Sequence, residues 1–378
     1  MKVLATAEYN EFVDAIKSND KQIICYGTGS VALSSEDIFR KSGIDKNLCC
    51  FIDRNPKKHG TTLAFSGRDV IIRGIDELCA MDLSNKVLLL TLEVFGAVIE
   101  SLNQYPELDN LECYIFPALN RSYIKQAIAN DEFCRSGYKI RGGEERIPRT
   151  IHYCWFGGTE IPPFMKECIA SWSEHNPNYE IVKWNENNYD VYQNNYIKQA
   201  YQAGNYAFVS DFARLDVLYK HGGIYFDTDV KVLKNLDDVL YNNSFIAYSK
   251  WSVLNSAVSG SMAGNEIIQK MRDYPRSTID FVNTDGSYNL DNNSVYESAT
   301  LAKFGFHKNF IHQSIMGMTV YPPCFFSTAV MSGLNYDIDE RTYAVHYAVG
   351  TWFDSKRTAE LMQTNAYIAN LKNTLERH

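Results

Sequence analysis

The sequence has no excess of positive charge, no cysteine pair at redox or zinc-binding spacing, and no apolar run long enough to cross a membrane. Its 37 lysines and arginines against 45 aspartates and glutamates give a net charge of -8 and a pI near 5.6. No cluster of basic residues offsets this balance, which argues against a nucleic-acid-binding protein held by phosphate contacts. The expected partner is therefore a small or neutral molecule.

The nine cysteines do not suggest a disulfide framework, because their number is odd and no two have the C-x-x-C spacing. No signal peptide is recognisable ahead of them. We therefore expect reduced thiols in a cytoplasmic protein. They are Cys25, Cys49, Cys50, Cys79, Cys113, Cys134, Cys154, Cys168 and Cys324.

The longest apolar run, residues 87–99, is interrupted by Glu93 and Gly96. It is far shorter than the roughly 20 residues that a membrane-spanning helix needs. No transmembrane segment is predicted. A soluble enzyme can still act on a lipid-linked acceptor, so the sequence leaves open a peripheral association with the inner face of the membrane.

The chain is long enough for about two domains, with 378 residues of which 45% are hydrophobic. In residues 1–118, apolar strand patterns alternate with helical patterns, which predicts a parallel, Rossmann-like α/β sheet. The strands are expected at residues 21–26, 48–52, 69–72, 86–91 and 112–116, and the helices at 8–18, from 75 and at 94–105.

A glycine-rich turn follows the strand at 21–26. Gly27, Gly29 and Ala32 fit the G-x-G-x-x-G/A phosphate fingerprint, and Asp53 ends the next strand where an acidic residue would hold a ribose hydroxyl. These four residues form a possible nucleotide site. The alternative is a tight turn in a docking or regulatory domain. The segments YGTGSVA and FIDRNPKKHG resemble a small domain often attached to bacterial polysaccharide enzymes, which implies a fold rather than a ligand.

Residues 119–146 are expected to form a linker helix and a charged, glycine-containing joint, so the second domain is predicted at 147–378. It opens with a strand that stops at Gly157 and Gly158. Trp155, near the end of this strand, is placed to stack on a nucleotide base, since ligands of open α/β sheets sit beyond the carboxyl ends of the strands. A core tryptophan is the alternative. A helix at 163–175 and a strand at 179–184 follow.

The stretch 208–233, FVSDFARLDVLYKHGGIYFDTDVKVL, predicts a helix that stops at Gly222, an apolar strand, then Asp227-Thr228-Asp229, and then a strand again. Side chains two apart on an extended chain project to the same side, so both carboxylates can converge on one cation. Carboxylate ligands suit Mg²⁺ or Mn²⁺, and such ions usually keep positions open for substrate phosphates. We therefore expect a nucleotide diphosphate as the third component.

Asp211 and Arg214 lie three residues apart on the helix and share one face. Such a pair is more often a surface ion pair than a site. Here the helix runs directly into the strand with the two aspartates, which favours a role in the same site.

Four segments resemble glycosyltransferase family 32, the DXD sugar-binding family that includes bacterial capsular polysaccharide transferases and fungal initiating mannosyltransferases. They are IPRTIHYCWFGG, VKWNENNYD, YAFVSDFARLDVLYKHGGIYFDTDV and YAVHYAVGTW, and they span residues 147–352 in the family's order. An isolated Asp-x-Asp is weak, whereas Ser-Asp-x-x-Arg followed by Gly-Gly-x-Tyr-x-Asp-x-Asp is specific. The resemblance implies a GT-A type fold for the second domain.

The resemblance also implies roles for single residues. Trp155 would stack on the base, Asp211 and Arg214 would hydrogen-bond the donor sugar, and Tyr225 would line the donor pocket. Asp227 would reach hydroxyls and the metal's shell, and Asp229 would bind the metal directly. His346 would be a third metal ligand and Trp352 would contact the β-phosphate. Asn255 is a weaker donor-pocket candidate, since it could be a turn residue, and His346 could be a buried, hydrogen-bonded histidine.

The expected function is a metal-dependent, retaining hexosyltransferase that uses Mn²⁺ or Mg²⁺ and takes a UDP-sugar, or as a second choice GDP-mannose. Its acceptor would be a glycan or lipid-linked saccharide of a surface polysaccharide such as a capsule. A non-catalytic nucleotide sensor or assembly protein is the alternative, and a Mg²⁺-dependent nuclease or phosphotransferase is a third reading. Residues 297–300 and 347–351 depart from the family pattern, which leaves the acceptor contacts open.

Overall fold

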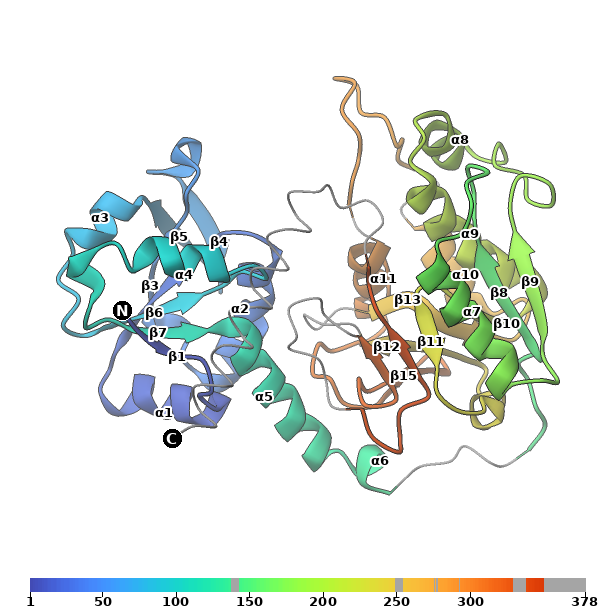
Figure 1. Ribbon diagram of the computed structural model, residues 1–378, viewed down its shortest axis with the longest axis horizontal. Helices are drawn as coiled ribbons and strands as arrows, with labels where there is room; N and C mark the ends of the chain where they lie inside the picture. The colour runs from blue at the N-terminus through green and yellow to red at the C-terminus, as the bar shows by residue number, and fades with distance from the viewer. Residues whose placement is uncertain are drawn as a thin grey trace. The chain divides into compact units, whose positions relative to one another are not determined.

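The computed structural model describes residues 1–136, 143–248, 254–274, 276, 278–291, 293–328 and 338–349, with only the backbone of Asn255. These residues form two compact units, 1–126 and 127–328 with 338–349 (Figure 1). The division falls inside one helix, and the domain boundaries predicted at residues 118 and 146 stay predictions. No helix in the described part of the chain has both the length and the apolar character needed to cross a membrane.

The first unit is a seven-stranded sheet in the order β1-β7-β6-β2-β3-β5-β4, in which every pair is parallel except β4–β5. This confirms the predicted Rossmann-like parallel sheet, with an antiparallel edge that the sequence reading missed. The elements are β1 (Lys2–Leu4), α1 (Tyr9–Ser18), β2 (Gln22–Tyr26), α2 (Ser30–Ser42), β3 (Leu48–Ile52), β4 (Thr62–Phe65), β5 (Arg68–Arg73), α3 (Ile75–Cys79), β6 (Lys86–Leu90), α4 (Gly96–Leu102), β7 (Glu112–Ile115) and α5 (Phe116–Asn130).

Both faces of this sheet are covered, which explains why its strands are apolar throughout. On one face, Ile24 and Leu88 belong to a core shared with α3 and α4, including Leu78 and Ile99. On the other face an aromatic cluster joins α1 and α2 to the sheet. Its edge-to-face pairs include Phe12 with Tyr114, Phe39 with Phe65 and Phe51 with Phe65.

The second unit has a mixed seven-stranded sheet in the order β14-β15-β12-β13-β10-β8-β9, and a small sheet in the order β11-β17-β16. Its elements are α6 (Glu132–Arg135), β8 (Thr150–Cys154), α7 (Pro163–His175), β9 (Glu180–Trp184), α8 (Asn195–Gln202), α9 (Tyr206–His221), β10 (Gly223–Phe226), β11 (Val230–Val232), β12 (Ser244–Tyr248), β13 (Leu254–Ser261), α10 (Glu266–Asp273), α11 (Asn293–Ala302), β14 (Gln313–Ile315), β15 (Met318–Tyr321), β16 (Phe326–Thr328) and β17 (Ala344–His346).

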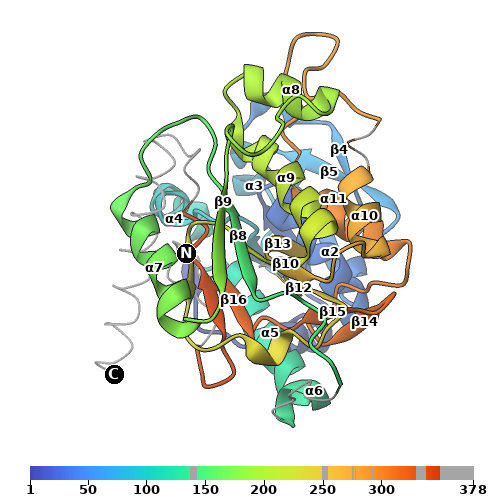
Figure 2. The ribbon, with the colours of Figure 1, turned by 90° about the vertical axis from the view of Figure 1, so that its right-hand side faces the viewer.

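In the second unit, β8, β9 and β10 run parallel, whereas β13 is antiparallel to β10. Figure 2 shows α7 on one side of the large sheet and α9, α10 and α11 on the other. The indole of Trp172 in α7 donates to the carbonyl of Val230 at 2.7 Å and packs against Phe226. Helix α7 is thereby fixed against the chain where it passes from the large sheet to the small one. The α/β fold class is confirmed in both units.

Two glycines turn the chain from α9 into β10. Gly222 and Gly223 have φ angles of +69° and +100°, which residues with a side chain rarely adopt. A Cβ on Gly223 would also stand 2.7 Å from Nε2 of His152. The reversal is thus possible only with glycine at this point, and it aligns β10 with β8 directly after the helix that carries Asp211 and Arg214.

Candidate active site

The two aspartates lie in a turn at the junction of the two sheets. Strand β10 ends at Phe226, β11 begins at Val230, and the backbone N–H of Val230 donates to the carbonyl of Asp227 at 3.0 Å. The predicted order of strand, Asp-Thr-Asp and strand is therefore found, but the expectation of an extended chain through Asp227 and Asp229 is wrong. The turn nevertheless brings the carboxylates together, because a tight turn also holds residues two apart close in space.

His346 reaches the turn through strand pairing. In the small sheet, Val230 of β11 is opposite His346 of β17, and the backbone N–H of Tyr347 donates to the carbonyl of Asp229 at 3.0 Å. One possible ligand atom from each of Asp227, Asp229 and His346 lies within 4.8 Å of the others. Residues far apart in the sequence thus form one cluster of two carboxylates and an imidazole.

Asp229 and His346 form a largely buried ion pair. Nε2 of His346 lies 3.3 Å from Oδ1 of Asp229, and the backbone N–H of Val349 donates to Oδ2 at 2.8 Å. Burial alone would raise the pKa of Asp229, but His346 and the Val349 hydrogen bond outweigh burial and lower it. Burial alone would lower the pKa of His346, but the negative charge of Asp229 and its hydrogen bond outweigh burial and raise it.

A divalent cation fits this donor set. Asp229 and His346 would exchange their shared proton for the ion, as metal ligands do on binding. Oδ1 of Asp227 already contacts Arg214 and the Tyr225 hydroxyl, which leaves its other carboxylate oxygen, Oδ2, for an ion. Two carboxylates and one imidazole suit Mn²⁺ better than Mg²⁺, because imidazole is a softer ligand than oxygen.

Arg214 links the helix to the turn. Its Nη2 lies 2.9 Å from Oδ1 of Asp211 and 3.0 Å from Oδ1 of Asp227. The hydroxyl of Tyr225 donates to the same Asp227 oxygen at 3.0 Å, and the guanidinium lies over the Tyr225 ring at 5.1 Å. The Arg214 side chain is 8% exposed and that of Asp211 is 16% exposed, so this is not a surface ion pair.

Burial raises the pKa of Asp211, although Arg214 and Arg276 oppose the rise. Burial also raises the pKa of Tyr225 far above its ordinary value, so the phenol stays a hydrogen-bond donor. Asp211 thus lies beside the cation cluster with one of its carboxylate oxygens held by Arg214. Such a group can accept hydrogen bonds from ligand hydroxyls.

Trp155 lies at the same edge of the sheet as the aspartates. It directly follows β8, in which His152 is opposite Tyr225 of β10. The indole is half-buried and donates to the carbonyl of Thr159 at 2.7 Å. Its ring is therefore oriented by its own loop, and it is not a fully buried core residue.

Two predicted donor-pocket residues cannot be placed by their side chains. Trp352 lies outside the described residues, and of Asn255 only the backbone is described, in β13 opposite Ala247. Sequence reasoning missed three buried polar residues next to Arg214, namely Ser256, Asn293 and Glu297. A signal for Ser256 was its position beside Asn255. No sequence pattern marks Glu297 as buried.

In the first unit, the glycine-rich turn and Asp53 do come together. Gly27 has φ +109°, Gly29 precedes the first turn of α2, and Ala32 is buried in that helix. The Asp53 carboxylate accepts a hydrogen bond from Thr28 and lies 3.1 Å from Nζ of Lys58. A ribose would have to displace these partners, and nucleotide binding here stays a prediction.

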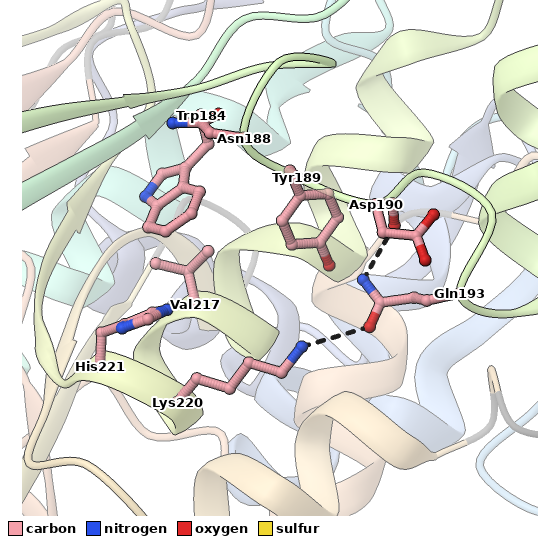
Figure 3. A pocket seen from close by; sticks show the side chains of 8 residues that line it. All are labelled: Trp184, Asn188, Tyr189, Asp190, Gln193, Val217, Lys220 and His221. Atoms are coloured by element: carbon pink, nitrogen blue, oxygen red, sulfur yellow. Dashed lines mark hydrogen bonds between the residues drawn. The ribbon is translucent and has the colours of Figure 1, made fainter.

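A separate pocket of about 240 Å³ lies beside the last turns of α9 (Figure 3). The Tyr- and Asn-rich segment at 185–195 supplies four of its residues. In Figure 3 the side-chain amide of Gln193 donates to the backbone carbonyl of Asp190 and accepts a hydrogen bond from Nζ of Lys220. The pocket is lined by Trp184, Asn188, Tyr189, Asp190, Gln193, Val217, Lys220 and His221.

Comparison with known families gives a match in the part of the chain that leads into and contains the aspartates. The family described as "Glycosyltransferase sugar-binding region containing DXD motif" matches residues 162–246. That range includes α9 and the turn with both aspartates, and it ends inside β12. Residues 162–246 belong to the DXD-containing glycosyltransferases. The family resemblance of the sequence is thereby confirmed, although nothing in the match concerns capsules. We refer to the second unit below as the transferase unit.

Two curated relatives align with parts of the chain. Inositol phosphoceramide mannosyltransferase 3 of Schizosaccharomyces pombe is 29% identical over 144 residues, which are 36% of this chain and 39% of the relative. Subversion of eukaryotic traffic protein A of Legionella pneumophila is 26% identical over 164 residues, which are 35% of this chain and 25% of the relative. The chain thus spans well under two thirds of either relative.

Among solved structures, the chain is similar to one titled "PaToxG Glycosyltransferase". The identity is 20% and the TM-score is 0.35, over 49% of this chain and 78% of that one.

Proposed function

We propose that the transferase unit moves a hexose from a nucleotide sugar to a glycan or lipid-linked saccharide, with Mn²⁺, or Mg²⁺, as cofactor. The observation that carries the proposal is the cluster of Asp227, Asp229 and His346, whose ligand atoms lie within 4.8 Å of one another. Arg214 joins this cluster to Asp211, so a cation site and a hydroxyl-binding carboxylate share one ion-pair network. A nucleotide sugar presents both a diphosphate and a hydroxylated ring to such a site.

The donor is a nucleotide diphosphate sugar, with UDP-sugars as the first choice from the sequence. The name of the Schizosaccharomyces pombe relative is that of a mannosyltransferase, which supports GDP-mannose as the second donor to test. Trp155 offers a half-buried indole at the sheet edge for the base. Because the indole N–H is held by Thr159, the ring plane is set before a base arrives.

Cleavage of the anomeric bond builds positive charge on the sugar ring and negative charge on the departing diphosphate. A bound Mn²⁺ would supply positive charge for the diphosphate. One carboxylate oxygen of Asp211 is held by Arg214, and the other would accept hydrogen bonds from hydroxyls of the sugar. Arg214 fixes the relative position of Asp211 and Asp227 because a guanidinium can bind two carboxylates in one plane. The family resemblance favours retention of the anomeric configuration, and no nucleophile is assigned.

The test is a thermal-shift panel of UDP- and GDP-sugars with and without Mn²⁺, followed by turnover of any donor that stabilises the fold. We expect one donor class to raise the Tm only with Mn²⁺. Asp229→Ala should abolish both the shift and the turnover, whereas Asp285→Ala, at an exposed carboxylate elsewhere in this unit, should leave them unchanged. Full Mn²⁺-dependent turnover in Asp229→Ala would refute the proposal.

The alternative, a non-catalytic nucleotide sensor or assembly protein acting through the first unit, makes the opposite prediction. The full chain would then bind a dinucleotide tightly without metal-dependent turnover. Asp53→Asn would weaken that binding and Asp229→Ala would not.

A further inference from the structure

A buried glutamate lies next to the proposed donor site but outside the cation cluster. Glu297 in α11 has no solvent exposure. Its Oε2 accepts the backbone N–H of Ser256 at 3.1 Å, and its Oε1 accepts a hydrogen bond from Nδ2 of Asn293. A carboxylate taken fully out of water usually has a specific partner or purpose, since its desolvation costs several kcal/mol.

The carboxylate holds a bulge in β13. Ile246 of β12 pairs with Ser259, but the next residue, Ala247, pairs with Asn255, so the register shifts and the segment from Ser256 leaves the ladder with β12. On one side of this bulge Glu297 takes the freed N–H of Ser256. Bulges of this kind re-aim the backbone next to sites.

The other side of the bulge holds the cation cluster. The carbonyl of Ala257 accepts the backbone N–H of Asp227 at 2.9 Å. Ser256, which directly precedes Ala257 in the chain, therefore links the position of Glu297 to that of Asp227 in the turn. A shift of the Ser256 backbone would move the carbonyl that anchors Asp227.

A second route runs through side chains. Nδ2 of Asn293 donates to Oγ of Ser256 at 2.7 Å, and Nη1 of Arg214 donates to the same oxygen at 3.4 Å. Arg214 in turn binds Asp211 and Asp227. Glu297 is thus connected to the donor-site carboxylates by both the backbone and the hydrogen-bonded side chains of one short segment.

Among the described residues, Arg214, Asp211 and Arg276 are the charged groups that act on Glu297. Arg214 and Asp211 come from α9, and Arg276 follows α10. Arg276 is 2% exposed and donates to Oδ1 of Asn293, while its Nε and Nη1 have no hydrogen-bond partner in the described part of the chain. Burial raises the pKa of Glu297 to about 7, although Ser256 and the two arginines favour the ionised form. The group therefore changes charge near neutral pH.

We propose that Glu297 is a positioning residue whose ionised carboxylate sets the Ser256 bulge, and through it Arg214 and Asp227, in the geometry that serves sugar transfer. The proposal rests on the proposed transferase function and adds a pH-sensitive control to the same site. It assigns Glu297 no contact with the substrate.

The hydrogen bonds explain why protonation would disturb the site. Both carboxylate oxygens face N–H donors, one from Ser256 and one from Asn293. If either oxygen of Glu297 is protonated, its O–H points at an N–H group, which cannot accept a hydrogen bond. The Asn293 amide can accept that proton only by turning its oxygen away from Arg276, which would also withdraw its N–H from Ser256.

The experiment compares kcat/KM of wild type and Glu297→Gln between pH 6 and 8, at saturating Mn²⁺. With a pKa of about 7 the ionised fraction rises from about 9% to about 91%, so wild-type kcat/KM should rise about tenfold. Glu297→Gln should show no such rise and should stay below the wild-type value at pH 6, since about 9% of the wild-type carboxylate is still ionised there. Glu266→Gln, at an exposed carboxylate of α10, is the matched control and should keep the wild-type profile.

A merely structural role would lower the activity of Glu297→Gln at every pH and keep the rise, which would overturn this inference alone. Should the variant fold poorly, ¹³C NMR of wild type labelled at the glutamate carboxyls replaces it. A glutamate resonance titrating at the kinetic midpoint is expected, and its absence overturns the inference. Wild-type protein inactive with every donor at every pH would instead refute the proposed function itself.

Discussion

Replacing Glu297 by glutamine should change how the stability of the transferase unit depends on pH. Burial raises the pKa of this carboxyl from 4.5 to about 7 in the folded protein. The neutral form is therefore the one that the fold prefers. The stabilisation is complete below pH 4.5, is lost as the pH rises through 7, and amounts to about 3 kcal/mol because each pKa unit corresponds to about 1.4 kcal/mol. Glutamine has no charge to bury and does not lose this stabilisation.

The free energy of unfolding of Glu297→Gln minus that of wild type should therefore rise between pH 5 and 8, by about 2–3 kcal/mol. The measurement is urea unfolding of metal-free protein followed by tryptophan fluorescence. Residues 1–126 contain no tryptophan, whereas Trp155, Trp172 and Trp184 lie in the transferase unit and report on its unfolding. Glu266→Gln, which removes an exposed carboxylate, should give a difference that does not change with pH. A pH-independent difference for Glu297→Gln as well would show that this carboxyl titrates normally and refute the reasoning.

Three further predictions concern the site and its support. Asp229→Asn still accepts the N–H of the loop after β17 but loses its charge, so Mn²⁺-dependent turnover should fall about 100- to 1,000-fold with little change in Tm. Arg214→Met leaves two partly buried carboxylates without their partner and should cost about 3 kcal/mol in urea unfolding. Gly223→Ala forces a side chain into a φ of +100° and against His152, and should cost at least about 2 kcal/mol. The matched control for this third prediction is Gly264→Ala, at φ +70° with open space, which should cost about 1 kcal/mol.

Local sequence signals predicted the elements that carry the site. The helix expected at residues 163–175 and the strand at 48–52 occur with those bounds. Prolines flank the helix, and the strand is an apolar run between the polar residues Asn47 and Asp53. The double glycine after α9 also predicted the turn into β10. These features depend on residues near one another in the chain, which a pattern can register.

The parts that the sequence could not predict are set by contacts between distant residues. The pairing of Val230 with His346 depends on the register of two strands more than a hundred residues apart. The burial of Glu297 depends on the bulge in β13, since α11 by itself reads as an ordinary polar helix.

The position of Glu297 is itself an argument for function. At neutral pH a glutamine there would accept from Ser256 and avoid the desolvation of a charge, so stability alone gives no reason for a carboxylate. Groups that reduce stability tend to persist where they serve activity. The same bulge that Glu297 holds by its Ser256 N–H anchors Asp227 by its Ala257 carbonyl. If the carboxylate had only a structural role, Glu297→Gln would keep the wild-type rise in kcat/KM between pH 6 and 8, and that result would remove the case for a pH-sensitive donor site.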